Sequence, residues 1–158
     1  MRLLRPVIAL FAALAIVLTI TASSVSAGGL HARVFLVRLT GDQEATATCA
    51  PPTVCGDPDA SAGMVILVLP RKDVVCFVTK WRNIDGTVVA AHIHPAPVGV
   101  PGPVAVPLFS GTFNGTDRAR GCVSGQGFAD DIASNPSGFY VNIHSSVYPA
   151  GAVRAQLD

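Results

Sequence analysis

Two histidines spaced two residues apart are the strongest indication of chemistry in this sequence. His92 and His94 end a run of β-branched and small residues. Successive residues of a strand face opposite sides, so both imidazoles emerge on one face with Cβ atoms about 6–7 Å apart. His144 ends another such run. If the two strands are neighbours with aligned ends, the three imidazoles converge, and a three-histidine set with an open position suits copper or zinc.

The same pattern also has an interpretation without a metal. Histidines at a strand end can pack against Tyr148 and Pro149 and hydrogen-bond to loop carbonyls, and a His-x-His pair alone is a weak motif. Tyr140 and Asn142 share the polar face of the second run with His144. Together with Tyr148, they are the candidates to surround a bound ion.

The sequence gives weaker indications of a catalytic site than of a metal site. Ser145 and Ser146 adjoin His144, but neighbouring residues of a strand point apart and no nucleophile elbow precedes them. Gln43 and Glu44 predict a polar hairpin tip, with a binding edge as the alternative. We therefore assign no catalytic residue and do not expect an enzyme.

Short strands must position these side chains. Helical periodicity is nearly absent after residue 30, whereas β-branched runs recur between clusters of Gly, Pro, Asn and Asp. The pattern predicts an all-β sandwich or barrel of about eight strands with Greek-key links. Residues 127–136 predict one short helix, a lid over one end. Alternation in the last run places Arg154 and Gln156 outward. The predicted strands are residues 32–39, 63–69, 73–81, 87–94, 104–109, 121–124, 138–144 and 152–157.

Four cysteines follow residue 30. Their even number favours two disulfides in an exported protein, although four cysteines permit three pairings. We favour Cys49 with Cys55, which closes a proline-rich loop, and Cys76 with Cys122, which joins two strands distant in sequence. A zinc–thiolate site is the alternative, but the sequence has no Cys-x-x-Cys pair.

Residues 1–27 predict a cleavable secretory signal. Arg2 and Arg5 precede an apolar run of about 15 residues, and Val25-x-Ala27 has the small side chains of a cleavage site. An uncleaved anchor is the alternative, but a span needs about 20 residues. We therefore expect residues 28–158 to form one secreted or cell-surface domain.

The charge balance excludes some partners. Loss of Arg2 and Arg5 with the signal takes the 11 basic residues to nine, against ten acidic ones. A nearly neutral chain without a basic run gives no indication of nucleic-acid binding, and no later apolar stretch reaches spanning length. We expect a monomer whose partner is an extracellular protein or surface ligand of unknown identity.

Three segments follow one another along the chain: residues 39–44, residues 90–94 followed by Gly99 and Gly102-Pro103-Val104, and residues 140–144 followed by Tyr148-Pro149 and residues 154–157. In this order they resemble the CHRD domain, a module named after chordin that also occurs as a stand-alone secreted bacterial protein. The resemblance covers residues 32–158 and implies an immunoglobulin-like β-barrel or sandwich, related in architecture to copper/zinc superoxide dismutase. It implies no settled activity.

The sequence also departs from that family pattern. The usual Gly-Gly-Glu before the last strand is Ala150-Gly151-Ala152 here, so any role of that acidic residue is lost. A two-metal dismutase site needs a fourth copper ligand, a bridging imidazolate and a zinc set with a carboxylate, and the chain has only four histidines. We therefore expect a non-enzymatic binding or structural module. The alternative is a redox protein that holds one copper or zinc ion at His92, His94 and His144.

Overall fold

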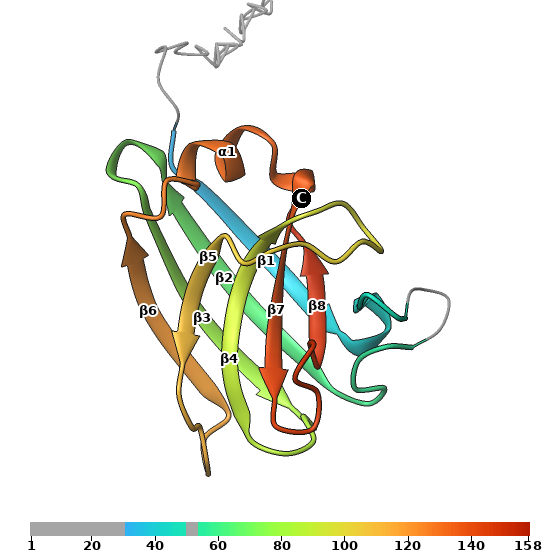
Figure 1. Cartoon of the computed structure of the whole chain (residues 1–158). Coiled ribbons are helices and arrows are strands. Elements are labelled where there is room, and N and C mark those ends of the chain that lie inside the picture. The colour runs from blue at the N-terminus through green and yellow to red at the C-terminus, as the bar shows by residue number, and fades with distance from the viewer. Residues whose placement is uncertain (1–30, 50–53) are drawn as a thin grey trace, which may run out of the picture.

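A computed structural model describes residues 31–49 and 54–158, so the predicted signal at 1–27 lies outside the described residues. Eight antiparallel strands form one sheet in the order β5-β4-β7-β8-β1-β2-β3-β6. The sheet curls until β5 and β6 approach each other, which gives a nearly closed barrel (Figure 1). The strands are β1 (Arg33–Thr40), β2 (Ser61–Leu69), β3 (Val74–Arg82), β4 (Val88–Pro95), β5 (Val106–Ser110), β6 (Arg118–Ser124), β7 (Phe139–Ser145) and β8 (Val153–Gln156).

The structure confirms the predicted all-β fold with eight strands and one short helix. Where the end strands β5 and β6 meet, the strands lie in the order β3-β6-β5-β4. This is a Greek key, because β4, β5 and β6 are consecutive in sequence and neighbours in space, and β3, which precedes them in sequence, lies beside β6. The largest difference from the predicted bounds is at β6, which begins at Arg118 rather than Gly121. Its pairing with β3 continues to Lys80 opposite Arg118. Pairing with a neighbour overrides the weak strand preference of these charged residues.

Alternate residues of the strands fill the barrel with aliphatic side chains. Leu39, Ile66 and Val141 are fully buried, as is Leu157 after the last strand. The helix α1 (Ala129–Ser134) lies across one end of the barrel, where it buries Ile132, as expected for a lid (Figure 1). Three short 3₁₀ turns, η1 (Gly41–Gln43), η2 (Pro70–Lys72) and η3 (Pro136–Gly138), complete the chain's regular elements within the described residues.

Both disulfides have the pairing favoured from the sequence. Cys76 and Cys122 stand directly opposite each other on β3 and β6. Cys49 and Cys55 close a loop whose residues 50–53 lie outside the described part. No helix in the described residues is long and apolar enough to cross a bilayer.

The two halves of the barrel's outer surface differ in exposure. On the β1–β2–β3–β6 side, outward side chains meet solvent, and Leu36 is 80% exposed. On the β4–β7–β8 side, loops cover the strands, and every residue of β7 is buried. The outward Arg154 is consequently only 1% exposed. This side therefore holds a second buried layer, made of polar groups, outside the apolar core.

Glu44 belongs to that covered layer, so the predicted hairpin tip is wrong at this residue. Its side chain is fully buried, and η1 packs against β8. The turn before β8 closes over it, because a Cβ atom added at Gly151 would lie only 2.1 Å from Oε2 of Glu44. Glu44 is buried because it packs against a turn more than 100 residues away in sequence, and no local sequence pattern predicts such a contact.

Candidate metal centre

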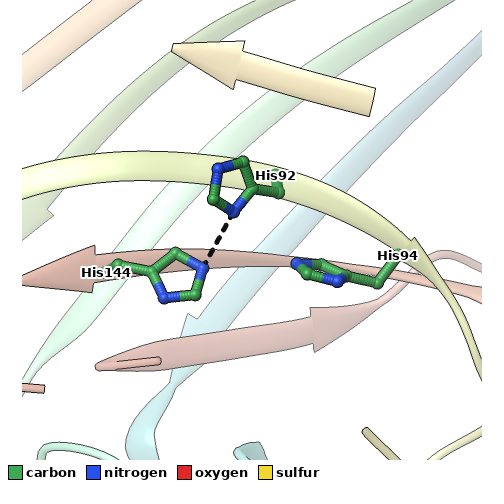
Figure 2. A group of neighbouring side chains, drawn as sticks. All are labelled: His92, His94 and His144. Carbon is green, nitrogen blue, oxygen red and sulfur yellow. Dashed lines mark hydrogen bonds between the residues drawn. The ribbon is translucent and has the colours of Figure 1, made fainter. Parts of the chain in front are cut away.

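Strand pairing brings the three predicted histidines together. In the antiparallel register of β4 with β7, Ala90 faces His144, His92 faces Asn142 and His94 faces Tyr140. The three imidazoles thus share the outer side of two adjacent strands, as Figure 2 shows. One ring nitrogen from each residue lies within 4.8 Å of the others. The convergence expected from the sequence is present.

Hydrogen bonds to loop carbonyls orient two of the rings. Nδ1 of His94 donates to the carbonyl of Gly102 at 3.0 Å, and Nδ1 of His144 donates to the carbonyl of Pro149 at 3.0 Å. A carbonyl oxygen only accepts, so the proton of each neutral ring lies on Nδ1 and the lone pair on Nε2. Nε2 of His144 lies 3.0 Å from Nδ1 of His92 (Figure 2). Two lone pairs therefore point to the region between the three rings.

The β4–β5 connection, residues 96–105, covers this region by folding back over β7 and β8 (Figure 1). Gly102 accepts from His94 and donates its N–H to the hydroxyl of Tyr140 at 3.2 Å. Arg154 donates to the carbonyls of Val100 at 3.0 Å and Pro97 at 2.8 Å. A Cβ atom at residue 102 would lie 2.5 Å from the carbonyl oxygen of Pro95, so only glycine allows this approach. The loop is a fixed part of the site.

A stack of polar side chains supports His94. Its ring lies parallel to Tyr140, at 4° and 4.7 Å between centroids. The guanidinium carbon of Arg154 lies 3.4 Å from the centre of the same phenol ring, a cation–π contact. Tyr140 therefore couples the position of His94 to that of Arg154.

Asn142 occupies the space between two of the histidines. Its Oδ1 lies 3.1 Å from Nε2 of His94 and 2.9 Å from Nε2 of His144. Because both ring protons are on Nδ1, neither Nε2 donates to this oxygen, which instead lies beside the two lone pairs. Nδ2 of Asn142 donates to Oε2 of Glu44 at 3.5 Å. Asn142 thus links the histidine cluster to the buried carboxyl group.

Tyr148, the third residue expected around the site, is placed differently. Burial raises the pKa of its phenol, and the charges of Asp57, Asp85 and Asp59 raise it further. Its backbone carbonyl accepts from the N–H groups of Ser145 and Gly151. Tyr148 therefore shapes, through its backbone, the turn that presents Pro149 to His144.

Burial keeps the three imidazoles neutral. It lowers the pKa of His92 to about 4, with a further contribution from the neighbouring His144 and His94. Burial also lowers the pKa of His94 and of His144, against the opposite effect of their hydrogen bonds to loop carbonyls. A neutral imidazole has a free lone pair, which is the form that binds metal ions.

The charges next to the site are buried as well. Burial raises the pKa of Glu44, while the N–H of Ala45 and the positive charge of Arg154 act in the opposite direction. Within the described residues, Arg154 forms no ion pair with Glu44, and its guanidinium donates to the loop carbonyls of Pro97 and Val100. The two groups therefore interact through their charges without direct contact, and Asn142 lies opposite Arg154 in the strand register.

The donor set fits a transition metal ion. Metal–imidazole bonds of about 2.0–2.1 Å allow two nitrogens on one ion to be at most about 4.2 Å apart. The three nitrogens lie within 4.8 Å of one another, so the widest pair exceeds that limit by at most about 0.6 Å. All four cysteines are in disulfides, so nitrogen is the ligand type this cluster offers.

The sequence predicted the three histidine ligands, but it did not predict that Glu44 and Arg154 are buried beside them. Glu44 and Arg154 lie in segments noted for their resemblance to the CHRD domain, and both are more than 98% buried. An arginine on the polar side of a strand normally predicts a solvated side chain. Only the covering loop at residues 96–105 reverses that expectation.

The barrel and its covered histidine cluster define an all-β protein with a potential nitrogen-donor metal site. The family model of the CHRD domain matches residues 35–157, and the chain belongs to that family. Neither a curated protein nor a solved structure matches the chain. Membership of the family supports a binding or structural module.

Proposed function

We propose that this protein is an extracellular CHRD-domain binding module that holds one copper ion through Nδ1 of His92, Nε2 of His94 and Nε2 of His144. The observation that carries the proposal is the orientation of the rings. Two of them are fixed by carbonyls so that their lone pairs converge beside the third. Such outer hydrogen bonds are a regular feature of metal-bound histidines.

Copper is favoured over zinc by the relative affinities of the two ions for nitrogen ligands. Imidazole nitrogen suits both metals, but the affinity of a given nitrogen site for divalent ions is greatest for copper. Three protein ligands leave a position open for a further ligand, and His92, the least buried of the three, lies on the accessible side. The absence of a fourth protein imidazole from the cluster makes a binding or redox role simpler than two-metal catalysis.

Export is part of the proposal. Removal of residues 1–27 releases residues 28–158 as one domain, in a compartment where two disulfides persist. The domain acts as a monomer, in the medium or at the cell surface, on an extracellular protein or surface ligand.

Metal content tests the site directly. After loading with equimolar Cu²⁺ and Zn²⁺ and removal of excess, we expect the wild-type domain to hold one copper ion per chain. The variant His92→Ala/His94→Ala should hold less than a tenth of that amount, because one imidazole alone is a weak ligand. Elemental analysis by mass spectrometry measures both metals.

His31→Ala is the matched control, because the fourth histidine lies outside the cluster. It should retain the full copper content. Equal, sub-stoichiometric metal in the wild type and the double variant would disprove the metal site and leave a binding module without a metal. Zinc in place of copper would overturn the choice of ion.

Asn142 is expected to position the ligands. Asn142→Ala removes the group between His94 and His144, and we expect copper affinity to fall about 10–100-fold, the usual effect of losing a supporting residue. Competition with a chromogenic chelator measures the dissociation constant. Thr79→Ala removes another buried polar group, on β3, and should cost stability with copper affinity unchanged. Equal affinities in the wild type and Asn142→Ala would contradict the positioning role.

A further inference from the structure

Exposed aliphatic side chains lie together on the outer side of β1, β2 and β3, the half of the barrel without the histidine cluster (Figure 1). The strand register places Leu36, Val65 and Val78 in one row across the sheet. Val34 and Leu67 form the next row. Leu36 is 80% exposed and Val78 57%. A contiguous exposed group of this kind marks an interaction surface.

Basic side chains flank this aliphatic group on the same outer side. The next row toward the end of β1 is Arg38, Gly63, Lys80 and Arg118, and Arg120 extends the aliphatic row on β6. The register therefore sets cations directly beside the aliphatic side chains. The exposed basic residues at outward positions of these strands are Arg38, Lys80, Arg82, Arg118 and Arg120.

Three further basic residues lie at the opposite end of the aliphatic group. Arg33 begins β1, Arg71 and Lys72 belong to η2 between β2 and β3, and all three are exposed. The chain has 11 basic residues, of which nine follow residue 30. Eight of these nine thus surround one aliphatic surface, and Arg154 is the ninth. The fold gathers a positive surface that the nearly neutral sequence does not show.

Few carboxylates offset these charges. The strands β1, β2, β3 and β6 contain no Asp or Glu. Asp117, directly before β6, pairs with Lys80 at 3.1 Å and with Arg118 at 3.4 Å, the two ion pairs in the described part of the chain. Arg38 and Arg120 therefore have no carboxylate partner and are available to an anionic ligand.

Gly63 leaves an open depression between basic side chains. A Cβ atom added at Gly63 would meet no atom within 4 Å. The depression has a volume of about 500 Å³, and Arg38, Lys80 and Arg82 line it. A second depression of about 500 Å³ lies over Val65 and is lined almost entirely by apolar groups. A basic depression beside an apolar one matches the headgroup and the acyl region of an anionic lipid.

We propose that this outer face of β1, β2, β3 and β6 docks on the surface of an anionic lipid bilayer. The aliphatic side chains enter the boundary between headgroups and acyl chains, and the basic side chains around them contact lipid phosphates. The proposal goes beyond the copper site and does not depend on it. It specifies the surface at which the domain acts.

The composition of the face favours a bilayer over other occupants. The exposed large apolar side chains of the described residues are all valine or leucine, so the face offers no aromatic ring for stacking against nucleic-acid bases. A second copy of the chain would set one basic rim against another, which like charges oppose. Aliphatic side chains within a basic rim complement acyl chains and phosphates together.

Cosedimentation of the exported domain with lipid vesicles tests the proposal. We expect binding to phosphatidylglycerol vesicles to be at least about tenfold tighter than to phosphatidylcholine vesicles, because each basic residue near an anionic surface adds affinity. The difference should decrease as salt is added, since salt screens exposed charges. Equal binding to both kinds of vesicle, or binding to neither, would overturn the proposal.

Arg38→Gln/Arg120→Gln removes two exposed cations that form no ion pair, so the variant should fold. Its affinity for phosphatidylglycerol vesicles should fall about tenfold or more. Val98→Glu/Val147→Glu is the matched control, because it lowers the net charge by the same amount at exposed positions of the β4–β5 and β7–β8 connections. The control should keep most of the affinity. An equal loss in both variants would mean that net charge alone controls binding and that the face is wrongly assigned.

Leu36→Ser/Val78→Ser tests the aliphatic contact. Its vesicle affinity should fall about tenfold, and the loss should persist at high salt because burial of apolar surface is not screened. Val98→Ser/Val147→Ser removes two exposed aliphatic side chains elsewhere and should bind as the wild type. A loss in the arginine variant without a loss in Leu36→Ser/Val78→Ser would indicate an acidic polymer as the occupant and disprove the bilayer.

The copper and lipid proposals can fail independently. His92→Ala/His94→Ala changes the other half of the barrel, and it should bind phosphatidylglycerol vesicles as the wild type does. Arg38→Gln/Arg120→Gln should keep the full copper content. Loss of vesicle binding in the histidine variant would place the lipid contact on the wrong side of the barrel.

Discussion

Arg154→Met is expected to lower the free energy of unfolding by about 1–3 kcal/mol at pH 7.5, the cost of leaving hydrogen-bonded groups without their partner. The change leaves Glu44 fully buried without the positive charge that favours its ionised form. It also leaves the carbonyls of Pro97 and Val100 without their donors. Urea unfolding followed by the fluorescence of Trp81 measures the difference.

The pH dependence of this loss of stability distinguishes the contribution of the Arg154 charge from that of its hydrogen bonds. Without the guanidinium, the pKa of Glu44 in the folded protein rises further above its unfolded value of 4.5. Such a group stabilises the fold below the unfolded pKa, and this stability is lost as the pH rises through the folded pKa. The deficit of Arg154→Met relative to the wild type should therefore shrink between pH 7.5 and pH 5.5.

A double variant completes the test. Arg154→Met/Glu44→Gln removes both charges and should be more stable than Arg154→Met alone at pH 7.5, with a coupling energy of about 1–3 kcal/mol. If the single and double variants are equally unstable at both pH values, the guanidinium acts through the loop carbonyls and the charge interaction described for the site is wrong.

Removal of the Cys76–Cys122 disulfide has the other large expected effect. The bond closes a segment with a sequence separation of 46 residues, and cross-linking a loop of that length restricts the unfolded chain by about 4 kcal/mol. Cys76→Ser/Cys122→Ser should lower the free energy of unfolding by approximately that amount, as measured by urea unfolding. The disulfide also joins β6, an end strand of the sheet, to β3.

The second disulfide provides an internal comparison. Cys49 and Cys55 are only six residues apart in sequence, so their bond restricts the unfolded chain by only about 2 kcal/mol. Cys49→Ser/Cys55→Ser should therefore be the more stable of the two variants. Equal losses, or a larger loss for the short loop, would contradict the loop-length argument.

Most of the fold could be predicted because apolar and polar residues alternate clearly along its strands. In β8, Val153 and Ala155 face the core and Arg154 faces away from it, as the twofold period requires. The same rule places His92 and His94 on one face. The convergence with His144 could be expected only conditionally, because the sequence does not state that β4 and β7 are neighbours.

The covered polar layer could not be predicted, because it depends on contacts between distant segments. Residues 41–44 look like an exposed turn, and the burial of Glu44 comes from Gly151. Asp57 lies between glycine and proline, a local pattern for a solvated turn, and its burial comes from the approach of Gly41 and Ala152. Periodicity reports which way a side chain points, and it does not report what lies above it.

The position of β8 has a consequence for how the chain matures. The last strand in the sequence lies between β7 and β1, where it joins the last hairpin to the first strand. Until β8 has been synthesised and is free to pair, the β7 side of the sheet is not joined to β1. The sheet is therefore completed only when β8 is present, and a protein without this strand would resemble a nascent chain rather than a smaller barrel.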